Sequence, residues 1–201
     1  MFTVQELCLF PEIVSKKKPL FIHVPKAGGM SIYGIFKNYN KDLPICLHRP
    51  VKSYPKAYRD SCFVFSFVRN PYDRLVSAYK YLTGGHGNGQ DTKFGKTLSL
   101  DFKCFVKNQL NNNLNWLHFK PMVHFLNDDI DFIGRMENYD HDFKIVCNEI
   151  GISCRKLPHK NKVNHKHYTG YYDDETREIV AKKYARDIEL FGYKFEEYTS
   201  R

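Results

Sequence analysis

Short apolar runs alternate along this 201-residue chain with longer segments in which apolar positions recur at helical spacing. The apolar runs predict strands near Leu20–Val24, Cys62–Val68 and Asp131–Gly134. The helical spacing predicts helices near Met30–Asn38, Pro71–Leu82, Leu100–Leu110, Tyr139–Ile150 and Asp174–Leu190. Such alternation is typical of an α/β fold, in which helices flank a parallel sheet. The length predicts a single domain over residues 1–201.

Residues that favour helix ends mark several of these boundaries. Asn70 is a good N-cap before Pro71, and Asp73 stands where the acid of a capping box would reach back. Asn138 precedes another apolar-periodic run, which Gly151 closes. By contrast, residues 83–97 (TGGHGNGQDTKFGKT) are polar and rich in glycine, which predicts a loop.

The segment 21–31 reads FIHVPKAGGMS and predicts a strand that ends in a glycine-rich loop, followed by a helix. Backbone N–H groups, a helix N-terminus and the Lys26 ammonium would then face one point, which favours a phosphate or a similar anion. In a Walker A loop the lysine follows the last glycine, whereas Lys26 precedes Gly28 and Gly29. We therefore expect an anion loop of another kind.

A second segment, residues 62–81, reads CFVFSFVRNPYDRLVSAYKY. Arg69 stands at the end of its strand, and Ser77 lies about two turns into its helix. Ligands of open α/β sheets bind at that end of the strands. A solvated arginine and a small helix residue would also explain this segment alone, but the two segments together favour a ligand site.

Together, HVPKAGGMS and FSFVRNPYDRLVSAY resemble the sulfotransferases that use 3′-phosphoadenosine 5′-phosphosulfate (PAPS). The resemblance is greatest to the carbohydrate sulfotransferase branch, with its heparan 2-O- and chondroitin 4-O-type enzymes. It continues through residues 132–152 and 171–195, so it covers nearly the whole chain. It implies a P-loop-like sulfotransferase fold and transfer of a sulfuryl group from PAPS to a hydroxyl, expected on a carbohydrate. Adenosine 3′,5′-bisphosphate would be the product.

In that family the first motif binds the 5′-phosphosulfate and the second binds the 3′-phosphate. The resemblance therefore implies these residues for binding the sulfate donor: Lys26, Ala27, Gly28, Gly29, Met30, Ser31, Arg69 and Ser77. Met30 departs from the family, which usually has a small hydroxyl residue there, and this removes one side-chain hydrogen bond to the phosphosulfate. The basic segment 160–172 (KNKVNHKHYTGYY) matches the place of a loop that covers the cofactor in relatives.

Sulfuryl transfer requires that charge on the bridging oxygen is stabilised and that the acceptor hydroxyl loses its proton. Lys26 suits the first task, and a histidine suits the second because its unperturbed pKa is about 6.5. In the 2-O- and 4-O-type relatives the base lies between the two motifs. The resemblance thus implies His48 as the catalytic base beside Lys26, while His86, His118 and His124 stay open as alternatives.

The net charge of +9 favours anionic partners. Because the basic residues are spread along the chain, a nucleotide and an anionic glycan explain this charge as well as nucleic acid does, and we expect no nucleic-acid partner. No signal peptide and no membrane-spanning run is visible, and the start at Met1 favours a soluble cytoplasmic enzyme over a trimmed catalytic domain. We expect reduced cysteines and no metal, since zinc-spaced cysteines and clustered carboxylates are missing.

Two other function classes stay open at this point. A P-loop kinase or nucleotide hydrolase would need a lysine after the glycines and a magnesium-holding aspartate at a strand end. The nearest candidates, Asp128, Asp129 and Asp131, precede their strand instead. A non-catalytic binder of anionic glycan or nucleic acid would use the basic surface, but it would not require the two motifs to occur together.

Overall fold

The structure, a computed structural model, describes residues 18–39, 48–126, 130–153 and 166–195. It divides into two compact units, which are taken one at a time. The first unit comprises residues 1–68 and 122–162, and the second comprises residues 69–121 and 163–201. The expected single domain over the whole chain stays a prediction.

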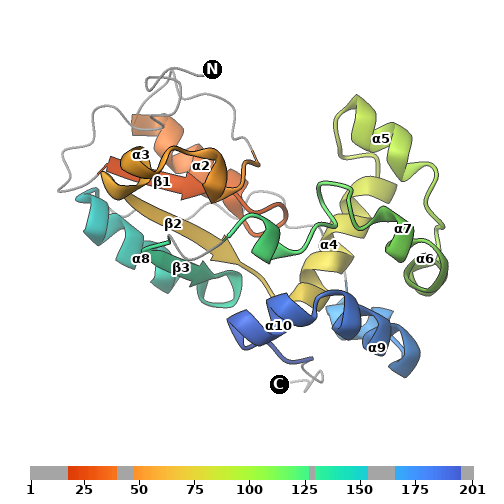
Figure 1. Ribbon diagram of the computed structural model, residues 1–201. Coiled ribbons are helices and arrows are strands. Elements are labelled where there is room, and N and C mark those ends of the chain that lie inside the picture. The colour runs from red at the N-terminus through yellow and green to blue at the C-terminus, as the bar shows by residue number, and fades with distance from the viewer. Residues whose placement is uncertain (1–17, 40–47, 127–129, 154–165, 196–201) are drawn as a thin grey trace. The chain divides into compact units, whose positions relative to one another are not determined.

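The first unit holds a parallel sheet with the order β1–β2–β3 (Figure 1). Its strands are β1 (Lys18–Ile22), β2 (Cys62–Val68) and β3 (Phe132–Arg135). In the register, Ile22 lies opposite Ser66, and Val68 lies opposite Arg135. All three strands therefore end at one edge of the sheet. The predicted α/β fold with a helix-flanked parallel sheet is confirmed.

Phenylalanines of β2 build the core of the first unit. Every residue of β2 is buried, which is typical of the central strand of a parallel sheet covered on both faces. Phe63, Phe65 and Phe67 share one face of the strand and pack in one cluster with α2 (Gly29–Tyr39) and α8 (Tyr139–Ile150). The short helix α3 (Lys56–Asp60) leads into β2. This packing fixes the end of β1 and the start of α2, where the anion loop lies.

The ends of α8 differ in part from the sequence prediction. Gly151 closes the helix in the left-handed conformation, as expected. Asn138 precedes the helix, but its side chain makes no capping bond and donates to Asp142 Oδ1 at 2.8 Å instead. Asp142 also accepts from the backbone N–H of Arg135 at 2.7 Å. The start of α8 is thus tied to the end of β3 through a carboxylate.

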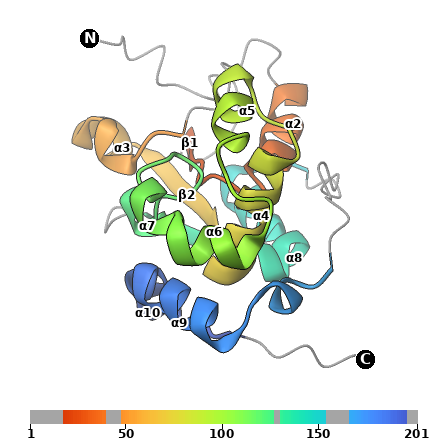
Figure 2. The same ribbon diagram turned by 90° about the vertical axis from the view of Figure 1, so that its right-hand side faces the viewer.

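The second unit is helical (Figure 2). Its helices are α4 (Pro71–Thr83), α5 (Gly89–Gly95), α6 (Phe102–Asn108), α7 (Leu110–Asn113), α9 (Asp174–Lys183) and α10 (Ala185–Phe191). Arg74 of α4 is only 1% exposed, and it donates to the carbonyls of His118 and Lys120 at 3.4 and 2.5 Å. It also lies over the ring of Tyr184, 5.8 Å from the ring centroid. This buried guanidinium therefore joins three segments of the unit.

Three segments of this unit differ from the sequence prediction. The glycine-rich stretch predicted as a loop contains α5, because the Asn88 side chain accepts hydrogen bonds from two backbone N–H groups at 3.0 Å. The helix predicted over 100–110 ends at Asn108, and Gln109 leaves helical geometry before α7 begins. The helix predicted over 174–190 breaks at Tyr184, whose hydroxyl donates to the Phe119 carbonyl at 2.7 Å.

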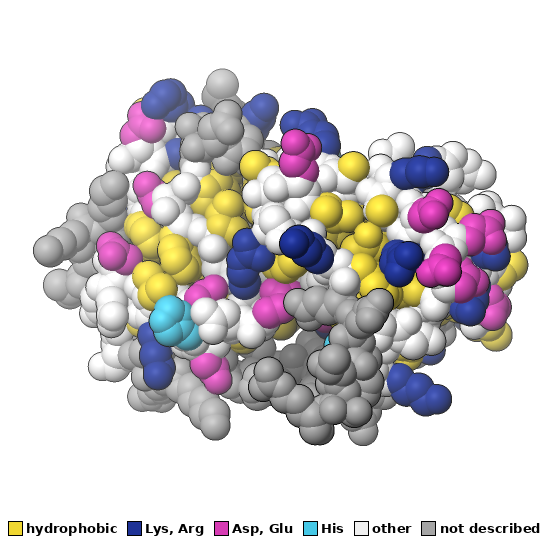
Figure 3. Space-filling model, turned by 90° about the horizontal axis from the view of Figure 1, so that it is seen from below, with side chains coloured by type: hydrophobic (Ala, Val, Ile, Leu, Met, Phe, Trp, Pro, Cys, Tyr) yellow, Lys and Arg dark blue, Asp and Glu magenta, His cyan; other side chains and the backbone are white. Residues whose placement is uncertain are grey.

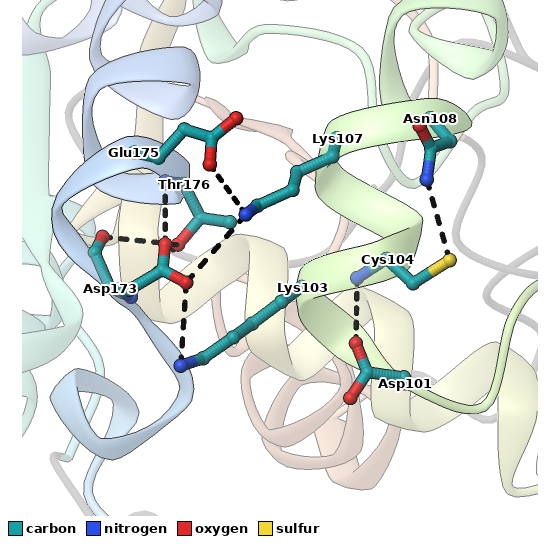
Figure 4. Close-up of polar contacts among 8 residues, drawn as sticks. All are labelled: Asp101, Lys103, Cys104, Lys107, Asn108, Asp173, Glu175 and Thr176. Carbon is teal, nitrogen blue, oxygen red and sulfur yellow. Dashed lines mark hydrogen bonds and ion pairs between the residues drawn. The ribbon is translucent and has the colours of Figure 1, made fainter.

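Lysines of α6 meet the start of α9 in a polar network (Figure 4). Asp173 caps α9 in a capping box with Thr176, as its place before the helix suggests. Lys103 Nζ lies 3.4 Å from Asp173 Oδ2, and Lys107 Nζ lies 2.5 Å from Glu175 Oε2. These contacts join two helices that are about 70 residues apart in sequence, and they neutralise part of the positive charge of α6.

Three of the six cysteines lie in the described parts of the chain. Cys62 and Cys147 are buried thiols as expected, and Cys104 is an exposed thiol. Cys8, Cys46 and Cys154 lie outside the described residues. On the face shown in Figure 3, Lys and Arg side chains lie among Asp and Glu side chains.

Candidate functional site

The anion loop predicted from the sequence lies between β1 and α2. The chain leaves β1 at Ile22, turns through residues 25–28 and enters α2 at Gly29. Among the described residues, Lys26 is the one non-glycine residue with positive φ, at 66°. This left-handed conformation costs a residue with a side chain roughly 1–2 kcal/mol. Strain of this kind gathers at functional sites, where the surrounding structure holds it in place.

Gly28 and Gly29 of the loop lie so close to neighbouring side chains that a Cβ atom would not fit at either position. Gly28 has a φ of 79°, and a Cβ atom there would meet Met136 Sδ and lie 2.7 Å from Tyr139 Oη. A Cβ atom on Gly29 would meet the imidazole ring of His23. Side chains that follow β1 and that lie at and just before the start of α8 thus press against the loop backbone, and only glycine leaves room for them.

Tyr139, the first residue of α8, holds the loop through its hydroxyl. It donates to the Gly28 carbonyl at 2.5 Å, and its ring meets Phe67 of β2 edge-on at 5.1 Å. Burial raises the pKa of Tyr139, although the Ser31 side chain and the Ile32 backbone act in the opposite direction. The phenol therefore keeps its proton at physiological pH and remains a hydrogen-bond donor.

The other loop residues differ in exposure. Ala27 and Ser31 are buried, Lys26 is half-buried, and Met30 is 49% exposed on the first turn of α2. The backbone N–H of Ser31 donates to the Gly28 carbonyl at 3.0 Å, which starts the helix. The structure thus brings residues 26–31 together in one turn at a helix N-terminus, a typical anion-binding arrangement.

His48 lies beside this loop through its contact with His23. The Nδ1 atom of His48 is 3.0 Å from the carbonyl oxygen of His23, and the two ring centroids are 4.1 Å apart. His23 links β1 to the loop and is only 4% exposed. His23 lies three residues before Lys26 in the chain. The contact with His23 therefore places the candidate base, His48, close to the start of the loop.

The competing histidines lie in other surroundings. His118 is buried in the second unit, where its Nε2 atom is 3.2 Å from Asp91 Oδ2 and its ring meets Tyr81 at 4.9 Å. His86, also in the second unit, is exposed. His124 belongs to the first unit and is exposed, with its ring against Phe125 at 5.0 Å. The arrangement of His118 is that of a structural contact between α5 and the segment before Phe119.

The second motif begins where β2 ends. Arg69 directly follows the strand, and its Nε atom donates to Asp73 Oδ2 at 2.8 Å. The prediction that Asp73 acts as the capping-box acid finds no support in this contact, because the carboxylate turns to the arginine. Asn70 caps α4 as predicted, accepting from the Tyr72 N–H at 3.1 Å. Ser77 lies one helical turn after Asp73 on α4 and is buried, whereas Arg69 precedes the helix.

A family model described as the sulfotransferase family matches residues 13–194. The chain belongs to the sulfotransferase family. An uncharacterised protein of Archaeoglobus fulgidus is similar, with 33% identity over 94 residues, which cover 46% of this chain and 71% of that protein. Membership supports transfer of a sulfuryl group to a hydroxyl acceptor. It does not favour the kinase, the nucleotide hydrolase or the non-catalytic binder.

The described half of the basic segment packs on α4 of this sulfotransferase. Residues Tyr168–Tyr171 form a 3₁₀ turn, and the Tyr168 hydroxyl lies 3.4 Å from Asn70 Nδ2. Tyr172 donates its hydroxyl to the Tyr72 carbonyl at 2.9 Å. Residues 160–165 of the segment lie outside the described residues. The segment is thus anchored beside the helix start that follows Arg69.

Two residues at the loop of the sulfotransferase were missed by the sequence reasoning. His23 lies inside the quoted motif, but it drew no attention because a histidine after a strand has no characteristic signal. Tyr139 lies in the stretch 132–152, where the sequence pattern predicts a strand and a helix but no functional side chain. Its distance of 111 positions from Gly28 in the sequence leaves no local pattern that could connect them.

Two further features of the described residues concern metal sites and membrane spans. Within the described ranges, no three His, Cys, Asp or Glu side chains are grouped so that they could hold a metal ion. None of the described helices is long and apolar enough to cross a membrane.

Proposed function

We propose that this sulfotransferase moves the sulfuryl group of PAPS to a hydroxyl of a carbohydrate and releases adenosine 3′,5′-bisphosphate. The observation that carries the proposal is the loop between β1 and α2. There Lys26 is held at positive φ ahead of two glycines and a helix N-terminus. His48 contacts His23, which directly precedes this loop. Such a loop offers an anion both backbone N–H groups and an ammonium group.

Residues 26–31 bind the 5′-phosphosulfate in this proposal. The glycines fit this role because they let neighbouring side chains press on the loop from the protein side, which holds its backbone N–H groups in one arrangement. Met30 contributes its backbone N–H group but no hydroxyl. Arg69 and Ser77 of the second unit bind the 3′-phosphate, since a guanidinium can meet two phosphate oxygens and a serine hydroxyl can donate to a third.

Lys26 and His48 carry the chemistry. The acceptor oxygen forms a bond to sulfur while the bond between sulfur and the bridging oxygen breaks. Lys26 stabilises the negative charge that the bridging oxygen gains, and His48 takes the proton that the acceptor hydroxyl loses. The bisphosphate leaves with the electron pair of the broken bond, so the reaction needs neither an oxidant nor a metal.

A carbohydrate acceptor is supported by the resemblance of both motifs to the carbohydrate branch of the family. The net charge of +9 suits an anionic glycan. Mass spectrometry after incubation with PAPS and a panel of glycans and small hydroxyl compounds tests the assignment. Sulfation of a glycan supports it, and sulfation of small phenols or alcohols alone overturns the carbohydrate assignment.

Ligand-dependent melting tests the sulfate donor separately from the acceptor. Adenosine 3′,5′-bisphosphate should raise the melting temperature, because a ligand that binds only the folded state stabilises it. ATP with magnesium should raise it less. A shift with ATP and magnesium but none with the bisphosphate would contradict the proposal and would return the chain to the kinase class.

The choice of His48 as the base is tested by alanine substitutions at His48, His86, His118 and His124. His48→Ala should lower kcat by about 10²–10⁴-fold and leave bisphosphate affinity nearly unchanged. The kcat of the parent should fall at acidic pH as the imidazole gains a proton, and this limb should vanish in the variant. Near-parental turnover of His48→Ala with loss in another variant would assign the base to that residue.

The basic segment 160–172 covers the bound nucleotide or the acceptor in this proposal, since its charge suits either anion. Its described end packs on α4 through Tyr168 and Tyr172, beside the helix start that follows Arg69. Binding of the bisphosphate should therefore slow amide hydrogen exchange in this segment. Unchanged exchange across residues 164–170 would remove the segment from the site.

A further inference from the structure

The contact between His48 and His23 determines which nitrogen of His48 can act as a base. The Nδ1 atom of His48 lies 3.0 Å from the backbone carbonyl oxygen of His23. A carbonyl oxygen only accepts hydrogen bonds, so Nδ1 must carry the proton that forms this bond. In the neutral ring, Nε2 is then the nitrogen with a free lone pair.

His23 itself is fixed by contacts on several sides. Its ring stacks on Phe21 of β1, with centroids 5.6 Å apart and planes at 23°. A Cβ atom at Gly29 would meet the same ring, so the imidazole lies against the first residue of α2. The ring of His48 lies over it at a centroid distance of 4.1 Å. His23 is thus a rigid connection between the candidate base and the anion loop.

We infer that His23 is the positioning residue of the general base, holding His48 in the Nδ1–H tautomer with Nε2 as the proton-accepting atom. The carbonyl of His23 selects the tautomer, and its ring supports the imidazole of His48 from one face. The inference rests on the proposed role of His48 as the base. A histidine that must take a proton is effective only when its other nitrogen is already protonated and its plane is fixed.

The tautomer can be measured in the protein without a sulfate donor or an acceptor. Long-range ¹⁵N–¹H spectra of ¹⁵N-histidine-labelled protein distinguish the two neutral tautomers by the shifts of their ring nitrogens. Spectra at about pH 8 lie above the usual histidine pKa of about 6.5. The His48→Asn variant identifies the His48 signal, and its amide can still donate to the His23 carbonyl. We expect the Nδ1–H pattern; an Nε2–H pattern overturns the inference.

Two substitutions at His23 separate its ring face from its nitrogens. His23→Ala removes the ring but keeps the backbone carbonyl that selects the tautomer, so the His48 signal should keep the Nδ1–H pattern while the lost support of the ring lowers kcat by about 10–100-fold. His23→Phe keeps a flat ring without nitrogen and should preserve the tautomer and most of the turnover. A His23→Ala variant with parental turnover overturns the inference, and so does a His23→Phe variant that loses as much turnover as His23→Ala.

The same measurements keep this inference distinct from the proposed function. If the parent shows the Nδ1–H pattern while His48→Ala keeps its turnover, the base assignment fails and the tautomer assignment stands. If His48→Ala loses turnover while the parent shows the Nε2–H pattern, the base stands and the role of His23 is overturned. The spectrum of the parent decides the tautomer even if a His23 variant fails to fold.

Discussion

The hydroxyl of Tyr139 donates to the carbonyl of Gly28 at 2.5 Å, and this bond joins the start of α8 to the anion loop. Gly28 adopts a positive φ, and its carbonyl also accepts from the Ser31 N–H at 3.0 Å. The carbonyl is thereby held on the protein side of the loop. The conformation of the loop therefore depends on Tyr139 of α8 as well as on the sequence of the loop itself.

Tyr139→Phe should loosen the loop without removing the ring that packs on Phe67. We expect the free energy of unfolding to fall by about 0.5–1.5 kcal/mol, the usual net value of one hydrogen bond. The affinity for adenosine 3′,5′-bisphosphate should fall as well, because the loop must then be ordered on binding. Chemical denaturation and calorimetry measure the two effects.

Tyr184→Phe is the matched control for this change. Its hydroxyl is also buried and donates to a backbone carbonyl, that of Phe119, at 2.7 Å. This variant should lose similar stability and keep its nucleotide affinity. Equal effects of both substitutions on affinity would show that Tyr139 has no special relation to the loop.

Lys26 combines a charge with a strained backbone, and two substitutions separate these properties. Lys26→Ala and Lys26→Gly both remove the ammonium, so each should reduce kcat by about 10²–10³-fold. Glycine also relieves a left-handed conformation that costs roughly 1–2 kcal/mol, partly offset by about 0.4–1 kcal/mol from its freer unfolded chain. Lys26→Gly should therefore be the more stable of the two in urea denaturation.

Two results would count against this view of Lys26. Turnover within a few-fold of the parent in both variants would exclude the ammonium from catalysis. A glycine variant less stable than the alanine variant would mean that the positive φ at this position stores no strain.

Arg69→Ala should weaken binding of adenosine 3′,5′-bisphosphate by about 1.5–3 kcal/mol, the range for hydrogen bonds to charged groups. Binding of adenosine 5′-monophosphate, which lacks the 3′-phosphate, should change little. Asp73→Asn keeps the guanidinium but removes the carboxylate that accepts from Arg69 Nε, so we expect a smaller loss. Calorimetry with both nucleotides measures the preference, and a parental preference in Arg69→Ala would remove the residue from the 3′-phosphate site.

The Asp173 network predicts a pH dependence of stability. Hydrogen bonds from the side chain and backbone of Thr176, and then the nearby Lys103, hold the pKa of Asp173 well below its usual value. A carboxylate with a lowered folded-state pKa contributes stability above its unfolded pKa of about 3.9 and loses it as the pH falls toward the folded value. The contribution should therefore be complete at neutral pH and should decline below about pH 4.

Asp173→Asn tests this dependence, because asparagine caps helices about as well as aspartate does. The parent should melt at a higher temperature than the variant at neutral pH, and the difference should shrink in acid. High salt should also reduce it, since the lysine contacts are partly exposed. A difference that stays constant with pH would mean that the charge of Asp173 contributes nothing.

The features that the sequence predicted correctly are those marked by residues that are neighbours in the chain. The bounds of β2 were predicted to the residue, because a run that is apolar except for Ser66 meets Arg69 at one end and polar residues at the other. The loop was predicted from its glycines and lysine, which are neighbours in the chain. The start of α4 followed from Asn70 and Pro71 for the same reason.

Distant contacts explain what the sequence did not show. The helix predicted over 174–190 breaks because Tyr184 reaches the Phe119 carbonyl, 65 positions away. The contact of His48 with His23 spans 25 positions and depends on where the sheet places both segments. Such contacts depend on how distant segments pack together, and no local pattern in a single sequence predicts them. The assigned roles of Lys26, His48, Arg69 and Ser77 remain proposals.

Met30 offers a final test, because the resemblance described above implies a small hydroxyl residue at this position and because Met30 is 49% exposed at the start of α2. Met30→Thr adds a hydroxyl that can donate to the 5′-phosphosulfate. We expect the affinity for PAPS to rise by about 0.5–1.5 kcal/mol, the net value of one added hydrogen bond. Met30→Val is the matched control, since valine has the shape of threonine without its hydroxyl. Calorimetry should show a gain in PAPS affinity for Met30→Thr alone. An equal change in both variants would mean that the effect comes from the loss of methionine. The side chain of residue 30 would then lie away from the phosphosulfate.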